Sequence, residues 1–392
     1  MYVWLALLIP IIAVWITYSK FKHEVAPTEI FIPVIAVFLV IIPFKLFVET
    51  SQTDDIEFLS NSIVSVRYEQ PYATWHVEQC SRTYYTGRGK HRRSHTVYYD
   101  CSKCLEYGPS YFKIDSRGNE YSIGSEEYKY IVRLWNTGEH FIELNRDINY
   151  NKPLFGSDCG KAGDAYISAW DKNPLTALAV IKEHTYENRI HAAHTVFEYK
   201  KLSPIELKRF EVRDYPSPVD GRMNSILGCD KFSWYKEAEV QRDIHLLNYI
   251  DGKYGPLRQC KTFVCLFKNK PISSAFAQEA YWEGGNKNEF VLCIGIDSVS
   301  RKLLWVKSFG WSTNKLVHVD AREEIMNQEY YNFYQVFKAL DGKVLPNFKR
   351  KEFADFNYIT IEPPFWSIVT IFIISILISI GTCICIVKND IN

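Results

Sequence analysis

Three stretches of the chain contain no charged residue: Tyr2 to Tyr18, Ile30 to Phe44, and Phe365 to Val387. A helix needs about 20 mainly apolar residues to cross the ~30 Å hydrocarbon layer of a bilayer. The third stretch has this length. The first gains it by continuing through Ser19, and the second by extending to Val48 with the Lys45 side chain reaching the headgroups. The pattern therefore predicts three transmembrane helices, at about residues 2–19, 30–48 and 364–387.

The basic residues flanking these stretches predict the orientation of the chain. Lys20 and Lys22 lie between the first two helices, and Lys388 lies in the short tail formed by residues 388–392. Because Lys and Arg collect in cytoplasmic loops, this connector and the tail are predicted to be cytoplasmic. The N-terminus and residues 49–363 are then extracytoplasmic. A signal peptide is disfavoured for the first stretch, which has no basic start and no A-x-A-like cleavage site.

Residues 49–150 read mostly as strands, with Tyr, Val and Thr alternating with polar residues. Residues 74–86 and 95–101 predict a hairpin around the basic tip GRGKHRRS, and pairing Tyr84 with Val97 places Cys80 opposite Cys101. A second hairpin is predicted over residues 111–123, followed by a helix from Ser125 to Trp135.

Residues 151–229 are rich in turns and predict a linking segment, with helices at Pro174–Lys182 and Tyr186–Thr195. From residue 230 to 363, helical and strand patterns alternate. Helices are expected at 231–249, 273–282 and 323–340, and strands at 262–267, 290–296 and 303–309. The nearly continuous apolar run FVLCIGI predicts a central strand that is covered on both faces. We therefore expect one sheet holding all three strands, within an α/β sandwich.

This order carries a resemblance to a known family. A long helix ending at YGP is followed by TFVCLF, then by WEGGNKNEFVLCIGID and KLLWVKSFGW. Residues 237–311 thus resemble the TPM-domain family. The resemblance implies a membrane-anchored α/β domain outside the cytoplasm that assists membrane complexes, and phosphatase activity is attributed to some members. The acidic motif of the family is only echoed at Val212–Tyr215, and residues 56–150 have no counterpart. As a whole, the chain resembles uncharacterised phage or bacterial membrane proteins, and the predicted fold class is membrane-anchored α+β.

Composition narrows the possible functions. The 46 basic and 45 acidic residues balance, which argues against a surface built to hold nucleic acid. Of the ten cysteines, Cys383 and Cys385 lie in the last apolar stretch, and the other eight form a set suited to disulfides outside the cytoplasm. There is no P-loop, dinucleotide fingerprint or Ser-His-Asp order, so neither a cofactor nor a catalytic residue is assigned.

Two cysteine and histidine motifs have competing interpretations. Cys101-Ser-Lys-Cys104, with His91 and His95 nearby, allows a zinc site or a redox pair. The predicted hairpin geometry and location favour a Cys80–Cys101 disulfide instead. His191-Ala-Ala-His194 could bind metal, but it lacks the glutamate of a metalloprotease and fits an amphipathic helix, so no metal site is assigned.

Two further groups are candidate binding residues. The hairpin tip concentrates Arg88, Lys90, Arg92 and Arg93, and Arg82 lies on the strand before it. They could bind lipid phosphates, a cell-wall polymer or an acidic partner, or they could simply be a solvated tip that prevents edge pairing. The segment between the 273–282 helix and the 290–296 strand suggests a ligand rim or a glycine helix cap with a polar turn. Its members are Trp282, Asn286, Lys287, Asn288, Glu289 and, after the last strand, Trp311.

The leading functional hypothesis is a membrane-anchored extracytoplasmic protein that binds or assists another envelope component. Its expected partners are the lipid bilayer and another membrane or envelope protein, and not nucleic acid. The alternative, from the TPM resemblance, is an extracytoplasmic hydrolase of the phosphatase type.

Overall fold

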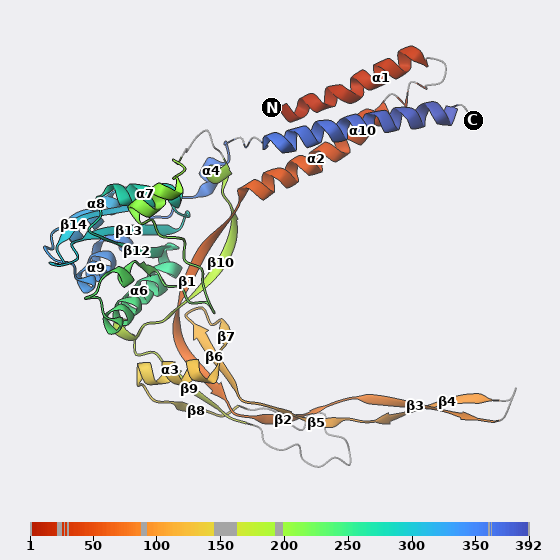
Figure 1. The fold of residues 1–392 in the computed structure, drawn as a ribbon. Coiled ribbons are helices and arrows are strands. Elements are labelled where there is room, and N and C mark those ends of the chain that lie inside the picture. The colour runs from red at the N-terminus through yellow and green to blue at the C-terminus, as the bar shows by residue number, and fades with distance from the viewer. Residues whose placement is uncertain are drawn as a thin grey trace.

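The structure is a computed structural model, and it describes residues 2–21, 26, 28–29, 31–87, 92–144, 163–192, 199–359, 361 and 363–390. Figure 1 shows three parts: a bundle of long helices, a body of sheets and helices, and a thin arm of strands that projects from the body.

The bundle contains α1 (Leu8–Lys20), which follows a 3₁₀ turn at Tyr2–Leu7, together with α2 (Phe31–Thr53) and α10 (Phe365–Asp390). The helices α2 and α10 are long and apolar enough to cross a membrane, and the apolar helix Trp4–Lys20 is shorter. Ala6, Val37, Ile41 and Ile371 pack at the centre of the bundle. Large apolar side chains such as Trp15, Phe47 and Leu377 are exposed on its outside. A continuous apolar exterior of this kind is what contact with lipid requires.

One long strand, β1 (Asp54–Glu69), begins directly after α2 and joins two regions of the body. Its first half pairs with β10 (Ala179–Glu187), and its second half lies between β6 (Ser110–Asp115) and β9 (Ala165–Ala169). The short strands β7 (Glu120–Ser122) and β8 (His140–Ile142) complete a six-stranded antiparallel sheet. The helix α3 (Ser125–Trp135) packs Tyr128, Ile131 and Trp135 against Ile63 and Val66 of β1. The second hairpin and the helix after it are therefore confirmed.

The helix predicted at Pro174–Lys182 is wrong, and the one predicted at Tyr186–Thr195 is helical only from Arg189 within the described residues. Pro174–Thr176 forms a single 3₁₀ turn, and the chain then extends as β10. The helix α4 comprises only Arg189–Ala192, and residues 193–198 lie outside the described residues. Pairing with β1 along its whole length satisfies the backbone of β10, a tertiary effect that outweighs local propensity.

The arm is built from two successive pairs of antiparallel strands. β2 (Tyr72–His76) pairs with β5 (Lys103–Tyr107), and further out β3 (Gln79–Thr86) pairs with β4 (Arg93–Asp100). The predicted hairpin is confirmed but its register is wrong, because Tyr84 faces His95 and Cys80 faces Tyr99. Moving the partner by two positions keeps every side chain on the same face, so the alternation of residues could not distinguish the two registers.

The second region of the body is an α/β layer structure. Its sheet has the order β11 (Ile226–Leu227), β12 (Lys261–Lys268), β13 (Glu289–Ile296), β14 (Leu303–Gly310). β11, β12 and β13 are parallel, and β14 is antiparallel to β13. The prediction that residues 262–267, 290–296 and 303–309 share one sheet is confirmed. All of β13 is buried, as its apolar sequence indicated.

Helices cover both faces of this sheet. On one face lie α6 (Glu237–Arg258), α8 (Leu316–Met326) and α9 (Phe333–Ala339). On the other lie α7 (Ser273–Tyr281) and Trp282, together with Phe58 of β1 and Ile181 of β10. The single helix predicted at 323–340 is in fact two, because the chain breaks before Asn332, whose side chain accepts a hydrogen bond from Tyr334 N at the start of α9. The sheet also begins at β11, before the predicted boundary at residue 230.

Close backbone contact locks the two regions of the body together. Gly252 and Gly255 of α6 lie against Ser62 and Ser60 of β1, and a Cβ atom on Gly255 would lie 2.2 Å from the Ser60 carbonyl oxygen. Ser60 Oγ donates a hydrogen bond to the Asp251 carbonyl oxygen at 2.9 Å, and Asn288 Nδ2 donates to the Phe58 carbonyl oxygen at 2.7 Å. The start of β1 is therefore held firmly against the α/β sheet.

Candidate functional site

A cavity of about 1160 Å³ lies where the start of β1, the turn after β10, and the loop between α7 and β13 meet. We call it the β1 cavity. Aromatic and polar side chains line it: Asp55, Asn188, Tyr199, Lys200, Lys201, Tyr215, Tyr281, Trp282, Glu283, Asn286 and Trp311. It is at the amino-terminal end of the parallel strands β12 and β13, whereas ligands of open α/β sheets usually bind at the carboxyl ends. The cavity therefore lies at the end of the sheet opposite to the usual ligand site of this sheet type.

Two glycines shape the loop that forms one wall of the cavity. Gly284 and Gly285 have φ of 84° and 77°, in the left-handed region that glycine adopts without strain. The Gly284 amide donates to the Glu279 carbonyl oxygen, which ends α7 with a helix cap. A Cβ atom on Gly284 would lie 2.2 Å from the Tyr199 hydroxyl oxygen. The loop is thus both a glycine cap and a cavity wall, and the two sequence interpretations are compatible.

Glu289, the first residue of β13, is fully buried behind this wall. Its carboxylate accepts hydrogen bonds from Asn286 N and Asn286 Nδ2, both at 2.9 Å. Burial raises the pKa of Glu289 to about 7; hydrogen bonds from Tyr215 and Asn286 act against this rise, and the charge of Asp55 adds to it. The carboxyl group therefore changes its charge near neutral pH.

A chain of hydrogen bonds links Glu289 to Asp55 across the cavity wall. Tyr186 Oη donates to Asp55 Oδ2 at 2.9 Å and lies 3.4 Å from Asn286 Oδ1. Asn188 Nδ2 also donates to Asp55 Oδ2, at 2.7 Å. Burial, followed by the charge of Asp55, raises the pKa of Tyr186, so its hydroxyl stays protonated. β1, β10 and the α7–β13 loop together fix the position of the Asp55 carboxylate.

The structure divides the six predicted rim residues into three groups. Trp282, Asn286 and Trp311 line the β1 cavity, and Glu289 lies directly behind Asn286. Lys287 and Asn288 do not line it. Asn288 is buried and bonds to the β1 backbone, as described above. Lys287 instead packs over the Tyr186 ring at 4.1 Å and pairs with the buried Glu57 carboxylate at 3.5 Å.

Glu57 is the centre of a buried charge cluster next to the cavity. Besides Lys287, it contacts Arg350 Nη2 at 3.1 Å and His184 Nδ1 at 2.9 Å. Burial, together with the Arg350 charge, lowers the pKa of Lys287. These ion pairs join β1, β10 and the α7–β13 loop, and they occupy the Lys287 ammonium with a protein partner.

Sequence reasoning missed Asp55, Asn188, Tyr199 and Tyr215 as members of the site. Asp55 lies far along the chain from the other three, and only the tertiary fold brings the four together. One local signal was present: Asp54 and Asp55 follow the apolar stretch of α2 after only five polar residues.

The arm is the second candidate site. Every residue of β4 is exposed, and all of β3 is exposed except the half-buried Cys80. Tyr84, Tyr85, Tyr98 and Tyr99 are all about half exposed or more, and none of the clusters of buried residues includes an arm residue. Of the predicted basic residues, Arg82 and Arg93 are exposed on β3 and β4. The exposed Arg92 packs its guanidinium over the Tyr85 ring at 4.2 Å. Arg88 and Lys90 lie outside the described residues.

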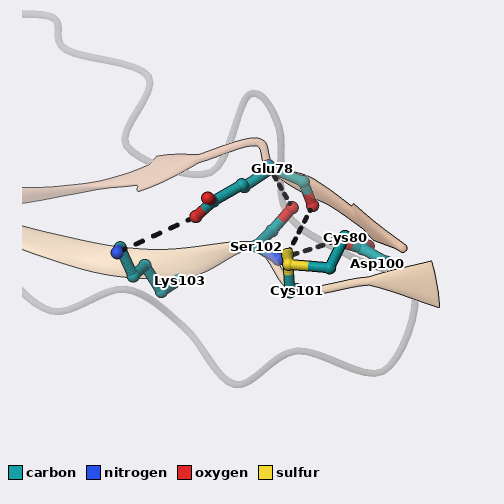
Figure 2. Close-up of a disulfide and its surroundings, with 6 residues drawn as sticks. All are labelled: Glu78, Cys80, Asp100, Cys101, Ser102 and Lys103. Carbon is teal, nitrogen blue, oxygen red and sulfur yellow. Dashed lines mark hydrogen bonds and ion pairs between the residues drawn. A yellow bond between two sulfur atoms is a disulfide. The ribbon is translucent and has the colours of Figure 1, made fainter. Parts of the chain in front are cut away.

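Figure 2 shows the predicted disulfide between Cys80 and Cys101, with Cα atoms 5.7 Å apart. It runs diagonally, because Cys101 lies one residue beyond β4, and the Cys101 amide donates to the Glu78 carbonyl oxygen at 3.0 Å. Cys104 is disulfide-bonded as well. Zinc binding needs thiolates, so the zinc and redox interpretations of Cys101-Ser-Lys-Cys104 do not fit this structure. His194 and the His191 side chain of the second histidine motif lie outside the described residues.

The expectation that all eight remaining cysteines serve disulfides is wrong. Cys229, Cys260, Cys265 and Cys293 are free. Cys265 and Cys293 are neighbours on β12 and β13 and pack in the core beneath α7. There they act as small apolar side chains, a common role for buried cysteine.

Comparisons of the chain with protein-family models, with curated proteins and with solved structures found no match.

Proposed function

We propose that this protein is a membrane-anchored extracytoplasmic binding protein that engages another envelope component through its arm. The observation that carries the proposal is the outer part of the arm, the exposed strands β3 and β4, which belong to none of the buried clusters among the described residues. An isolated two-stranded hairpin is only marginally stable, and here disulfides hold it in shape. A covalently braced structure with no role in the core is well explained by a partner outside the chain.

The side chains of the arm suit a protein partner. Tyr and Arg are enriched at protein interfaces and supply much of the binding energy there. Tyr84, Tyr85, Tyr98 and Tyr99 provide aromatic surface, and Arg82, Arg92 and Arg93 outnumber the one acidic residue of the outer hairpin, Asp100. We therefore propose that the arm binds an acidic surface of another membrane or envelope protein.

The bundle supports the proposed topology of three crossings. Figure 1 shows that the end of α1 and the end of α10 lie at the same end of the bundle, and that α2 and α10 both connect to the body at the other end. Lys20 and Lys388 thus share one side. With these lysines in the cytoplasm, the body, the arm and the N-terminus lie outside.

A site-specific cross-linking experiment in native host cells tests the partner. A photoreactive residue replaces Tyr98, which is 65% exposed on the arm, and the matched control replaces Val299, which is 89% exposed in the turn after β13. The Tyr98 position should capture one defined envelope protein that the Val299 position does not. The double change Arg92→Glu and Arg93→Glu should abolish capture and leave the thermal unfolding of the body unchanged. Capture of lipid or cell-wall material alone, or equal capture by both positions, would refute this assignment.

A labelling experiment tests the topology separately. A cysteine introduced in place of the exposed Val299 should react with a membrane-impermeant maleimide on intact cells, whereas one introduced in place of Lys388 should react only after lysis. The reverse pattern would place the body in the cytoplasm.

The phosphatase-type hydrolase remains a hypothesis that rests on the sequence resemblance alone. The Lys287 ammonium, the one cation among the predicted rim residues, is held by Glu57 and the Tyr186 ring. The carboxyl groups that border the cavity would repel a phosphate ester bound deep inside it. No described feature of the cavity favours this reaction.

A further inference from the structure

The β1 cavity has two acidic groups that lack a cationic partner. Within the part of the chain that the structure describes, no Lys, Arg or His forms an ion pair with Asp55 or Glu289; their partners are the neutral groups of Tyr186, Asn188, Asn286 and Tyr215. Asp55 lines the cavity, and Glu289 lies directly behind it. A cation that enters the cavity would therefore meet carboxyl groups that are not already paired with a described basic side chain.

Much of the remaining lining of the cavity is aromatic. The rings of Tyr215 and Trp282 contact one another in a tilted arrangement with centroids 4.4 Å apart, and Phe58, Tyr199, Tyr281 and Trp311 also line the cavity. The faces of such rings attract cations, and aromatic groups combined with carboxylates are the usual way in which proteins recognise organic ammonium groups. The volume of the cavity also exceeds what a single metal ion would fill. An organic ammonium group fits this environment.

Basic side chains occur only at the rim among the residues that line the cavity. Lys200 pairs with Glu206 at 2.5 Å, just before α5 (Pro204–Phe210), and Lys201 next to it is exposed. The cavity thus combines an acidic aromatic interior with a basic edge. A ligand that is cationic at one end and anionic at the other would satisfy both.

The cavity also lies next to the bundle. Asp55 is only two residues beyond the end of α2, a distance of about 7 Å along a strand. α2 has 23 residues and a length of about 35 Å, compared with ~30 Å for the hydrocarbon layer. With α2 spanning the membrane, Asp55 stands at the level of the lipid headgroups.

From these observations we infer that the β1 cavity binds an ammonium group attached to a phosphate ester. This chemistry is shared by a phosphoethanolamine lipid headgroup and by free phosphoethanolamine. The ammonium enters between the aromatic rings toward Asp55, and the phosphate remains at the rim near Lys201. The lipid source rests on the membrane anchoring proposed above, whereas binding of the free compound does not.

The test measures binding of O-phosphoethanolamine to the full chain, purified in an uncharged maltoside detergent, by titration calorimetry. Saturable binding is expected, ethanolamine should bind more weakly, and inorganic phosphate should not compete. Asp55→Asn should weaken binding about tenfold, because it removes a charge-assisted contact. Lys201→Glu should also weaken it, and it alters only an exposed side chain, so it should not disturb folding. Lys268→Glu, an exposed lysine at the opposite end of β12, is the matched control and should have no effect.

Nanodiscs containing phosphatidylethanolamine or phosphatidylglycerol identify the source. Photo-cross-linking of the protein to a phosphatidylethanolamine probe, competed by excess unlabelled phosphatidylethanolamine but not by phosphatidylglycerol, identifies the headgroup; binding of the free compound without that cross-link identifies the soluble ligand. Either result supports the inference. Competition by phosphate alone, unchanged affinity in Asp55→Asn and Lys201→Glu, or no binding from either source overturns it. None of these outcomes bears on capture through the arm, so the two proposals fail separately.

Discussion

Glu289→Gln should change the stability of this protein in opposite directions at low and high pH. The native carboxyl group is fully buried, and its pKa is raised from 4.5 to about 7, chiefly by burial. An unfolded chain loses this proton near pH 4.5, whereas the folded chain keeps it until about pH 7. Over that interval the unfolded state binds fewer protons, so the free energy of unfolding falls as pH rises.

The size of the effect follows from the shift of the pKa. Each unit corresponds to 1.36 kcal/mol, so ionising Glu289 in the folded protein costs about 3 kcal/mol by pH 8. Glutamine has no proton to lose and avoids this cost. Its single carbonyl oxygen can satisfy only one of the two Asn286 donors well, a loss of about 1 kcal/mol. The variant should thus be about 1 kcal/mol less stable at pH 4 and about 2 kcal/mol more stable at pH 8.

Thermal unfolding of the full chain in detergent at pH 4 and pH 8 measures this difference. The titratable groups that face Glu289 are Asp55 of β1, Tyr186 of β10, Tyr215 and Cys260, and they are the same in both proteins. Glu323→Gln, at an exposed position of α8, is the control, and its melting temperature should differ from the native value by the same amount at both pH values. A melting temperature for Glu289→Gln that differs from the native value by the same amount at both pH values would refute the reasoning.

Three further predictions concern the framework around the sites. Replacing Cys80 and Cys101 by Ser should make the arm the first point of protease cleavage, detected by gel, because a cross-link over 21 residues contributes about 3 kcal/mol; unchanged cleavage would contradict this. Asp251→Asn leaves the buried Lys261 ammonium without its ion-pair partner and should lower the free energy of unfolding by about 3–5 kcal/mol, measured by thermal unfolding. Gly255→Ala should lower the melting temperature by several degrees as β1 separates from α6, and Gly342→Ala, where a Cβ atom meets nothing within 4 Å, should not.

The sequence by itself determined those parts of the protein whose structure depends on residues that are close together in the chain. The uncharged stretches indicated the long helices α2 and α10, because a membrane-length helix is specified by its own composition. The run FVLCIGI indicated a buried central strand, because every position on both faces is apolar. The disulfide was predictable even with the wrong register, because Cys80 and Cys101 flank the same hairpin within reach of one another.

The tertiary structure alone decided where β10 and the β1 cavity are. Residues 179–187 form a strand because they pair with the whole first half of β1, and no pattern within the segment predicts that pairing. Asp55, Asn188, Tyr215 and Asn286 meet only because Gly252 and Gly255 let α6 approach β1, while Asn288 holds β1 at the sheet edge. The same contact places the Lys287 ammonium beside the Glu57 carboxylate, so Lys287 forms an ion pair within the protein. A sequence specifies the chemistry of each side chain, but long-range packing selects which of them face one another, and here it selected the cavity.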